Sequence, residues 1–239
     1  MKILFILLTT VLSLSAFAQK SSTLVDPNAK PRSLNGSFTA ITVTDGIDLY
    51  LTAGTEESLA VSFADEKYEE KFKTEVEDGV LKIYFDNRGI NYSDNNRRKL
   101  KAYVSFKTLE KLTASGGANV KLPTAISVNN FEMKFTSGSL FEGEVKAKEI
   151  TLDQSSGSVV TISGSSDKIT IEASSGAILK GYAFTTDYCN AKTSSGGEVR
   201  ISVGKELSAK AHSGGGIHYK GTAIIKDIDI SSGGVVKKV

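Results

Sequence analysis

Two histidines are the side chains of this sequence best suited to acid–base chemistry. His212 and His218 lie on either side of a Ser-Gly-Gly segment, residues 213–215, and serine is abundant around them. A serine beside a histidine can act as a nucleophile when a carboxylate orients the imidazole and an oxyanion hole receives the developing charge. The spacing identifies neither of these further groups. We therefore interpret both histidines as surface residues, and we predict no catalytic residue.

A pair of carboxylates is the second candidate site. Asp153 and Glu172 occupy the same position in two consecutive repeats, and lysines take that position on either side, Lys134 and Lys192. Two carboxylates at strand spacing could act as acid and base on a glycosidic bond, or bind Ca²⁺. The alternating sign of charge is better explained by surface ion pairs, each of which contributes little. A polysaccharide-active enzyme is kept as an alternative.

The chain has little material for metal or redox chemistry. Its single cysteine, Cys189, and its two histidines cannot form an internal disulfide or a structural zinc site. Cys189 stands in a column of the repeat that is otherwise apolar, where a free cysteine behaves as a small hydrophobic residue. We predict that Cys189 is buried, and we predict no metal site and no cofactor.

Basic residues cluster near residue 95. Arg88, Arg97, Arg98, Lys99 and Lys101 surround Tyr92 in a polar stretch. Such a patch could bind acidic glycans or lipid headgroups, but a solvated loop explains it equally simply and is the reading we favour. With 29 Lys and Arg against 27 Asp and Glu, the net charge is +2. This balance excludes a protein that depends on phosphate contacts, so we expect no nucleic-acid partner.

The second half of the sequence is repetitive. A Ser-Gly-small triplet recurs about every 19–20 residues, with the triplets beginning at Ser115, Ser137, Ser156, Ser175, Ser195, Ser213 and Ser232. Aligned on the glycine, apolar residues stand seven and five positions before it, with Lys226 in the last copy as the exception, and polar residues stand six and four positions before it. Apolar residues return three positions after it. A period near twenty is typical of a solenoid.

This alternation predicts strands, because only a strand places neighbouring side chains on opposite faces. One pair of strands cannot bury its apolar side, whereas stacked copies can. The sequence therefore predicts an all-β fold, a parallel β-helix or β-solenoid with turns of about 19–20 residues over residues 113–239. Right-handed coiling is the default for parallel connections. Glycine at the corner suits a positive φ, and the stacked serines could bind sugar hydroxyls, although turn formation explains them more simply.

Residues 36–112 are also rich in strands but less regular. A hairpin is predicted over residues 72–85, with Asp78-Gly79 at its turn. Residues 86–98 form a polar insertion. Because an open solenoid end exposes strand edges, we expect this region to start and cap the coil.

The N-terminus resembles an export signal. Lys2 precedes an apolar run over residues 3–14, and Ala16-Phe17-Ala18 matches a cleavage site, so residues 1–18 are predicted to be a signal peptide. The run is too short to span a membrane, and no later run reaches eighteen apolar residues, so we expect no stable membrane insertion. Residues 19–35 are predicted to be a flexible lead-in.

Three stretches carry a resemblance to a known family. Residues 38–49 contain Gly46-Ile47-Asp48, residues 76–83 contain Asp78-Gly79, and the serial Ser-Gly repeats follow. In this order they resemble the head GIN domain family, auto-transporter adhesin heads of Bacteroidetes-type bacteria. The resemblance covers roughly residues 36–236. It implies a right-handed β-solenoid, a location in the envelope or at the surface, and an adhesin-like role; it supplies no catalytic residues.

Taken together, the sequence predicts an exported, non-enzymatic β-solenoid of the cell envelope. It would act as an adhesin-like or scaffold protein that binds a glycan or a surface protein, in the periplasm, at the outer membrane or outside the cell. The alternatives are the polysaccharide-active enzyme, a lyase or hydrolase, and a structural module that associates with itself. The last repeat favours self-association, because no segment that would cover its apolar residues is evident in the sequence. These residues are Ile228, Ile230, Val235 and Val236.

Overall fold

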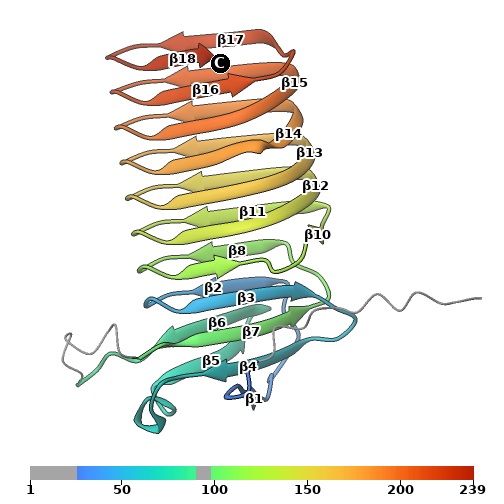
Figure 1. Ribbon diagram of the computed structural model, residues 1–239, viewed down its shortest axis with the longest axis vertical. Helices are drawn as coiled ribbons and strands as arrows, with labels where there is room; N and C mark the ends of the chain where they lie inside the picture. Colours follow the sequence, from blue (N-terminus) through green and yellow to red (C-terminus); the bar gives the residue numbers. More distant parts are fainter. Residues whose placement is uncertain (1–25, 90–97) are drawn as a thin grey trace, which may run out of the picture.

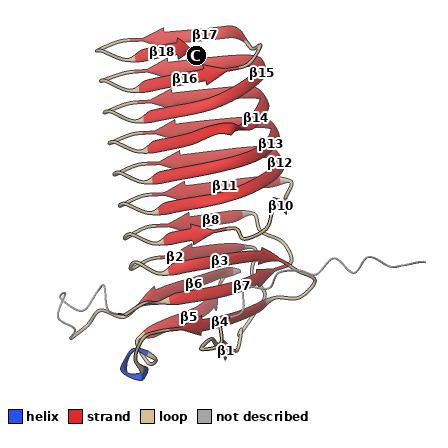
Figure 2. Cartoon of the chain, viewed as in Figure 1, coloured by secondary structure: helices blue, strands red, loops and turns tan. Residues whose placement is uncertain are grey.

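The described part of the chain is a single stack of strands. The computed structural model describes residues 26–89 and 98–239, so the predicted signal peptide, residues 19–25 of the predicted lead-in, Tyr92 and Arg97 lie outside it. About seven turns are stacked along the long axis, and strand makes up 62% of the structure (Figure 1). The one helical segment in the described residues is a 3₁₀ turn, Glu66–Tyr68 (Figure 2). The predicted all-β solenoid is confirmed.

The repeats form long strands that bend around the coil. Each of the central strands runs from one Ser-Gly corner to the next and pairs in parallel with its neighbours above and below. The strands of this region are β8 (Lys111–Ala114), β9 (Asn119–Lys121), β10 (Ile126–Ser127), β11 (Asn130–Phe135), β12 (Leu140–Gln154), β13 (Val159–Ala173), β14 (Ile178–Thr193), β15 (Glu198–Ala211), β16 (Gly216–Lys220), β17 (Ile224–Ile230) and β18 (Val235–Lys238).

The Ser-Gly corners are tight turns with two left-handed residues. At one corner, Ser175 has a φ of 52° and Gly176 a φ of 73°, and the N–H of Ala177 donates to the carbonyl of Ser174 at 3.0 Å. Two positive φ values closed by this bond define a type I′ turn. The serine therefore adopts the left-handed conformation as the glycine does. The sequence pattern indicated a positive φ for the glycine alone. In the first repeat the two left-handed residues are Gly116 and Gly117. They are the second and third residues of that triplet, whereas in the other repeats the left-handed residues are the first and second.

The same turns also pair with one another along the stack. From Gly138 to Gly214, each corner glycine N–H donates to a serine carbonyl of the next corner at 3.0–3.2 Å. The residue after the glycine points inward and is small. A Cβ at Gly197 would lie 2.3 Å from the carbonyl oxygen of Ala173, whereas Ser158 fits and donates its hydroxyl to the carbonyl of Phe135 at 3.0 Å. Close stacking therefore explains the small third residue of the triplet.

The apolar columns fill the interior of the coil. In one column Ile150, Ile169, Cys189 and Leu207 are register partners on successive strands, and all are buried. The next copy of this column has Lys226 in the sequence alignment, but the register shifts there and Ile225 pairs with Leu207 instead. Burial of each inward Ile, Leu or Val contributes about 1.5–3 kcal/mol, so these columns supply the main stabilising force.

The coil extends further toward the N-terminus than the Ser-Gly repeats. β2 (Ala40–Val43) and β3 (Asp48–Ala53) flank a corner at Asp45-Gly46, and both residues have positive φ. On one side they pair in parallel with β8 and β9, and on the other with β6 (Val80–Phe85) and β7 (Lys101–Phe106). The turn that comes first in the chain therefore lies between two turns that come later.

Antiparallel strands cover the N-terminal end of the stack. β5 (Phe72–Glu77) pairs with β6 in the predicted hairpin, and β1 (Lys30–Arg32) and β4 (Ser58–Ser62) continue from β7. Asp26 anchors the start of this layer, since its carboxylate accepts bonds from Tyr103 Oη at 2.7 Å and Ser62 Oγ at 2.8 Å. These bonds lower the pKa of Asp26 from 3.8 to about 2, and the hydrogen bond to Tyr103 is the largest cause.

Candidate functional site

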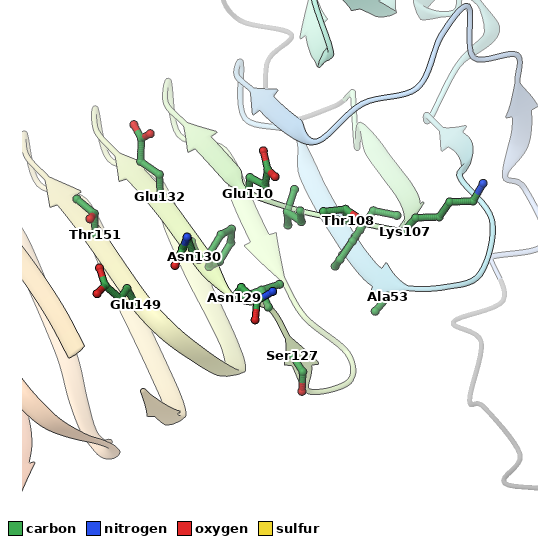
Figure 3. A pocket seen from close by; sticks show the side chains of 14 residues that line it. Ala53, Lys107, Thr108, Glu110, Ser127, Asn129, Asn130, Glu132, Glu149 and Thr151 are labelled. Atoms are coloured by element: carbon green, nitrogen blue, oxygen red, sulfur yellow. The ribbon is translucent and has the colours of Figure 1, made fainter. Parts of the chain in front are cut away.

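A groove of about 770 Å³ lies beside the bend of three successive turns. Figure 3 shows its polar side chains arranged along the neighbouring strands. The lining residues come from the end of β3, the loop between β7 and β8, strands β10 and β11 with the loop between them, and β12: Ala53, Phe106, Lys107, Thr108, Leu109, Glu110, Ser127, Val128, Asn129, Asn130, Phe131, Glu132, Glu149 and Thr151.

Parallel pairing brings these loops together. The N–H of Glu132 donates to the carbonyl of Glu110 at 2.8 Å, so β11 begins directly beside the end of the preceding loop. The carbonyl of Asn129 accepts from the N–H groups of both Lys148 and Glu149, at 2.9 and 3.0 Å. Three segments about twenty residues apart in the sequence, two loops and the bend of β12, are therefore fixed next to one another by backbone hydrogen bonds.

The groove is lined by exposed acidic and amide side chains above a buried apolar base. Phe106, Leu109 and Phe131 are 1–2% exposed and belong to the core. The exposed polar groups are the side chains of Lys107, Thr108, Glu110, Ser127, Asn129, Asn130, Glu132, Glu149 and Thr151. Aromatic rings are thus not presented for stacking, and a ligand would meet mainly hydrogen-bonding groups.

Lysines partly balance the acids of the groove. Glu132 lies 2.7 Å from Lys111 Nζ, and Glu149 lies 3.7 Å from Lys168 Nζ. All four side chains are about half exposed, so water screens these ion pairs and each contributes little to stability. Carboxylate and amide oxygens remain able to accept hydrogen bonds, and the amide nitrogens can donate them. The arrangement suits a hydroxyl-rich ligand.

His212 lies in a small polar cluster outside the groove. His212 Nδ1 lies 2.6 Å from Ser231 Oγ, and His212 Nε2 lies 3.7 Å from Asp229 Oδ2. A serine and a carboxylate are therefore both near this imidazole, but the carboxylate is beyond hydrogen-bonding distance and the cluster lies on the outside of a corner. His218 pairs in register with Arg200 and Lys237 instead. The two histidines are not brought together.

The predicted carboxylate pair has the expected neighbours. Asp153 and Glu172 are register partners on β12 and β13. Asp153 lies 3.5 Å from Lys134 Nζ, and Glu172 lies 3.0 Å from Lys192 Nζ. All four side chains are about half exposed, and neither acid lines the groove. The geometry matches the reading of surface ion pairs.

Cys189 is enclosed by the core, as its column predicts. Its side chain is 4% exposed, and burial raises the pKa of the thiol to about 12. Because the thiolate is the reactive form, this cysteine is inert in the folded protein at neutral pH.

The predicted basic patch needs a correction. Arg98 is 4% exposed: its guanidinium packs 4.2 Å from the centre of the Phe85 ring and donates to Asn87 at 2.8 Å. Arg88 binds Asp86 at 2.6 Å. Arg98 is therefore part of the core boundary and not of a binding surface, because its planar cation stacks well on an aromatic face.

The described residues contain neither a candidate metal site nor a membrane-spanning helix. Within residues 26–89 and 98–239, no group of three or more His, Cys, Asp or Glu side chains is placed to hold a metal ion. Over the same residues, no helix has the length and apolar character needed to cross a membrane.

Comparison with known families identifies the group to which this coil belongs. Residues 37–223 match the family described as "putative auto-transporter adhesin, head GIN domain". The chain belongs to this family. The match includes the groove and all Ser-Gly corners except the last, and it confirms the resemblance that the sequence carries. A comparison with curated proteins found no match.

Solved structures share the fold of this head GIN domain. An adhesin-like protein from Bacteroides fragilis, described as a putative adhesin, has a TM-score of 0.80 at 15% identity and covers 88% of this chain and 96% of its own. A putative adhesin from Parabacteroides distasonis has a TM-score of 0.69 at 20% identity, over 88% and 96%. A protein from the same species described as a putative lipid binding protein has a TM-score of 0.62 at 20% identity, again over 88% and 96%.

The groove was missed by reasoning from the repeat. Glu132 and Thr151 stand six positions before their glycines, in the polar column of the repeat, but the sequence pattern does not place them near the loops at 107–110 and 127–130. The available signal was the irregular spacing there: the equivalent glycines Gly117 and Gly138 are further apart than the others, and polar residues fill the extra length.

Proposed function

We propose that this protein is an exported, non-catalytic adhesin-like protein of the cell envelope that binds a hydroxyl-rich glycan in the groove. The observation that supports this most directly is the row of exposed carboxylate and amide side chains across three adjacent turns. Sugar hydroxyls both donate and accept hydrogen bonds, and such a row offers partners for both along an extended chain. The groove volume lies within the range of ligand sites, about 300–1,000 Å³.

Charge narrows the class of ligand. Three glutamates line the groove, Glu110, Glu132 and Glu149, together with Lys107. Lys111 and Lys168 pair with Glu132 and Glu149, so the groove has no excess of positive charge that would select an anionic glycan or a phosphate. We therefore expect neutral or amino sugars. Export is supported by the predicted signal peptide over residues 1–18, and the adhesin-like role is that of the family.

Binding to an array of defined glycans tests this proposal. We expect the exported protein to retain neutral or amino-sugar chains, and the double variant Asn129→Ala/Asn130→Ala to lose at least tenfold in affinity. Glu172→Gln is the matched control, because Glu172 is an exposed acid on the next strand but outside the groove. Equal binding by the double variant and the control would refute the groove as the site.

The polysaccharide-active enzyme is the competing function. Glu110, Glu132 and Glu149 provide carboxylates in one groove, which is the minimum that glycoside cleavage requires. Release of reducing ends or unsaturated products from bound polysaccharides would favour it. Tight binding without release of product would support the non-catalytic role.

A further inference from the structure

A row of basic side chains runs along one wall of the coil. Each Ser-Gly corner reverses the chain, so the segments before and after the corners form two walls of stacked strands (Figure 1). In the wall that follows the corners, four successive turns carry a basic residue at the same outward position. These residues are register partners, and we call them the basic column: Lys180 in β14, Arg200 in β15, His218 in β16 and Lys237 in β18. Neighbouring strands are about 4.8 Å apart, so the column follows the long axis of the stack.

The other wall balances its charges between turns. There, Glu172 lies 3.0 Å from Lys192 Nζ of the next turn. The basic column contains no acid, and within the described residues the one carboxylate within 4.0 Å of a member is that of Glu198, 2.7 Å from Arg200 Nε. Like charges directly opposite each other destabilise a sheet. The stability of the fold therefore does not explain why these charges stand together.

A fifth basic residue widens the column. Lys220 is the register partner of Ser202, two positions along the strand from the column, and its Nζ lies 4.6 Å from the centre of the Tyr182 ring. An aromatic face holds a cation without neutralising its charge. Glu198 is the one acid in this wall of the four turns, residues 178–182, 198–202, 216–220 and 235–238, all of which the structure describes. The wall therefore has an excess of positive charge at its surface.

We propose that the basic column binds a linear acidic polysaccharide that carries a carboxylate on each sugar. The spacing of the turns, about 4.8 Å, is close to the length of one sugar in an extended chain. A chain that lies along the stack therefore brings successive carboxylates to successive basic residues. Lysine and arginine donate charge-assisted hydrogen bonds to carboxylates. None of the column residues lines the groove, so this is a second site that does not depend on the function proposed for the groove.

The shape of the patch favours a single chain over other anionic partners. The positions that flank the column are mostly uncharged, with Ile178 and Val235 on one side and Tyr182 and Ser202 on the other. The positive charge is thus confined to a narrow row, whereas an anionic membrane is a surface that extends in two directions. A DNA duplex presents its phosphates about 3.4 Å apart along each strand, which does not match the spacing of the turns.

Titration of the protein with a linear oligogalacturonate, followed by calorimetry at low salt, tests the proposal. We expect binding that weakens as salt rises, because exposed charges are screened. The double variant Lys180→Gln/Lys237→Gln should raise the dissociation constant about tenfold. Lys192→Gln/Lys210→Gln is the matched control, because it removes the same charge from the other wall, in β14 and β15. The control should leave the dissociation constant unchanged.

Thermal unfolding of the same two variants gives a second readout. The column variant should melt no lower than wild type at low salt, because it relieves repulsion between like charges. The control should melt slightly lower, because it breaks the ion pairs of Lys192 with Glu172 and of Lys210 with Asp227. A lower melting temperature for the column variant would show that the column stabilises the fold, and would contradict the argument for binding.

Three binding results would overturn the proposal. The protein could fail to bind oligogalacturonate at low salt, or the two lysine variants could lose affinity equally, which would reduce the effect to net charge. Tighter binding of a DNA duplex or of phosphatidylglycerol vesicles would assign the column to another class of partner. The groove variant Asn129→Ala/Asn130→Ala should bind oligogalacturonate like wild type, and a loss there would place the acidic glycan in the groove instead.

Discussion

Glycine at position 164 gives the sharpest test of how the turns stack. Gly164 has a φ of 108°, and a Cβ there would lie 2.2 Å from the carbonyl oxygen of Val145 on the neighbouring turn. Gly164→Ala therefore combines an unfavourable backbone angle with a contact against backbone that must move. We expect a loss of about 3–5 kcal/mol in the free energy of unfolding, of which about 1–3 is backbone strain and the rest is displacement of β12.

Two matched variants separate these contributions. Gly176 has a φ of 73° with nothing within 4 Å of a Cβ, so Gly176→Ala should cost only the left-handed conformation, about 1–2 kcal/mol. At Gly204 a Cβ would lie 3.3 Å from Asp187 Oδ1, the end of a flexible side chain, and 3.6 Å from the carbonyl oxygen of Thr186, which is an ordinary contact; the φ of Gly204 lies outside the left-handed region. Gly204→Ala should therefore be within about 0.5 kcal/mol of the wild type.

Urea unfolding followed by circular dichroism measures the three variants. Stacked repeats can open locally, so hydrogen exchange of β12 and β13 should accompany the global measurement. Faster exchange confined to these strands in Gly164→Ala would agree with a local displacement. The reasoning is refuted if Gly164→Ala costs no more than Gly176→Ala, because the close approach of Val145 would then contribute nothing.

Three further predictions concern single side chains. The pKa of the Asp26 carboxyl is about 2 in the folded protein, against an ordinary value of 3.8. The ionised carboxylate therefore stabilises the fold above pH 4, and this stabilisation is lost as the pH falls toward 2. Asp26→Asn should cost about 1–2 kcal/mol at pH 7 after screening, and the difference from wild type should shrink below pH 3 in acid titrations. Cys189 should resist alkylation at pH 8 in the folded protein and react on unfolding, and modification of native protein would contradict its raised pKa. Ser175→Asn should raise the melting temperature slightly, since asparagine tolerates the left-handed region better than serine; a lower value would argue against turn strain at that corner.

The repeat was predictable from the sequence because each column obeys one physical rule. Alternation at positions such as Ile169, Thr170 and Ile171 identified strand faces, and the buried register of β13 follows it. The hairpin at Asp78-Gly79 was equally readable, since both residues take positive φ. The order of the N-terminal turns was not predictable, because parallel pairing of β2 with both β6 and β8 depends on contacts distant in sequence.

Two residues, Arg98 and Lys226, lie in environments that the sequence pattern did not predict. Arg98 belongs by composition to a charged loop, but its methylene stem and planar cation can equally pack on Phe85, and the structure takes this option. Lys226 occupied an apolar column in the alignment only because a register shift inserts one residue before Asp227. Neither outcome has a signature in the residues themselves.

The groove lies where extra residues interrupt the regular repeat. A regular turn repeats its neighbours, so its outward residues form ladders of ion pairs such as Asp153 with Lys134, which are satisfied by the stack itself. A ligand needs polar groups that the stack leaves available. These arise where extra residues interrupt the turns, as at 107–110 and 127–130, and parallel pairing then places the interruptions side by side. In a solenoid of this kind, the binding site is to be sought where the period fails.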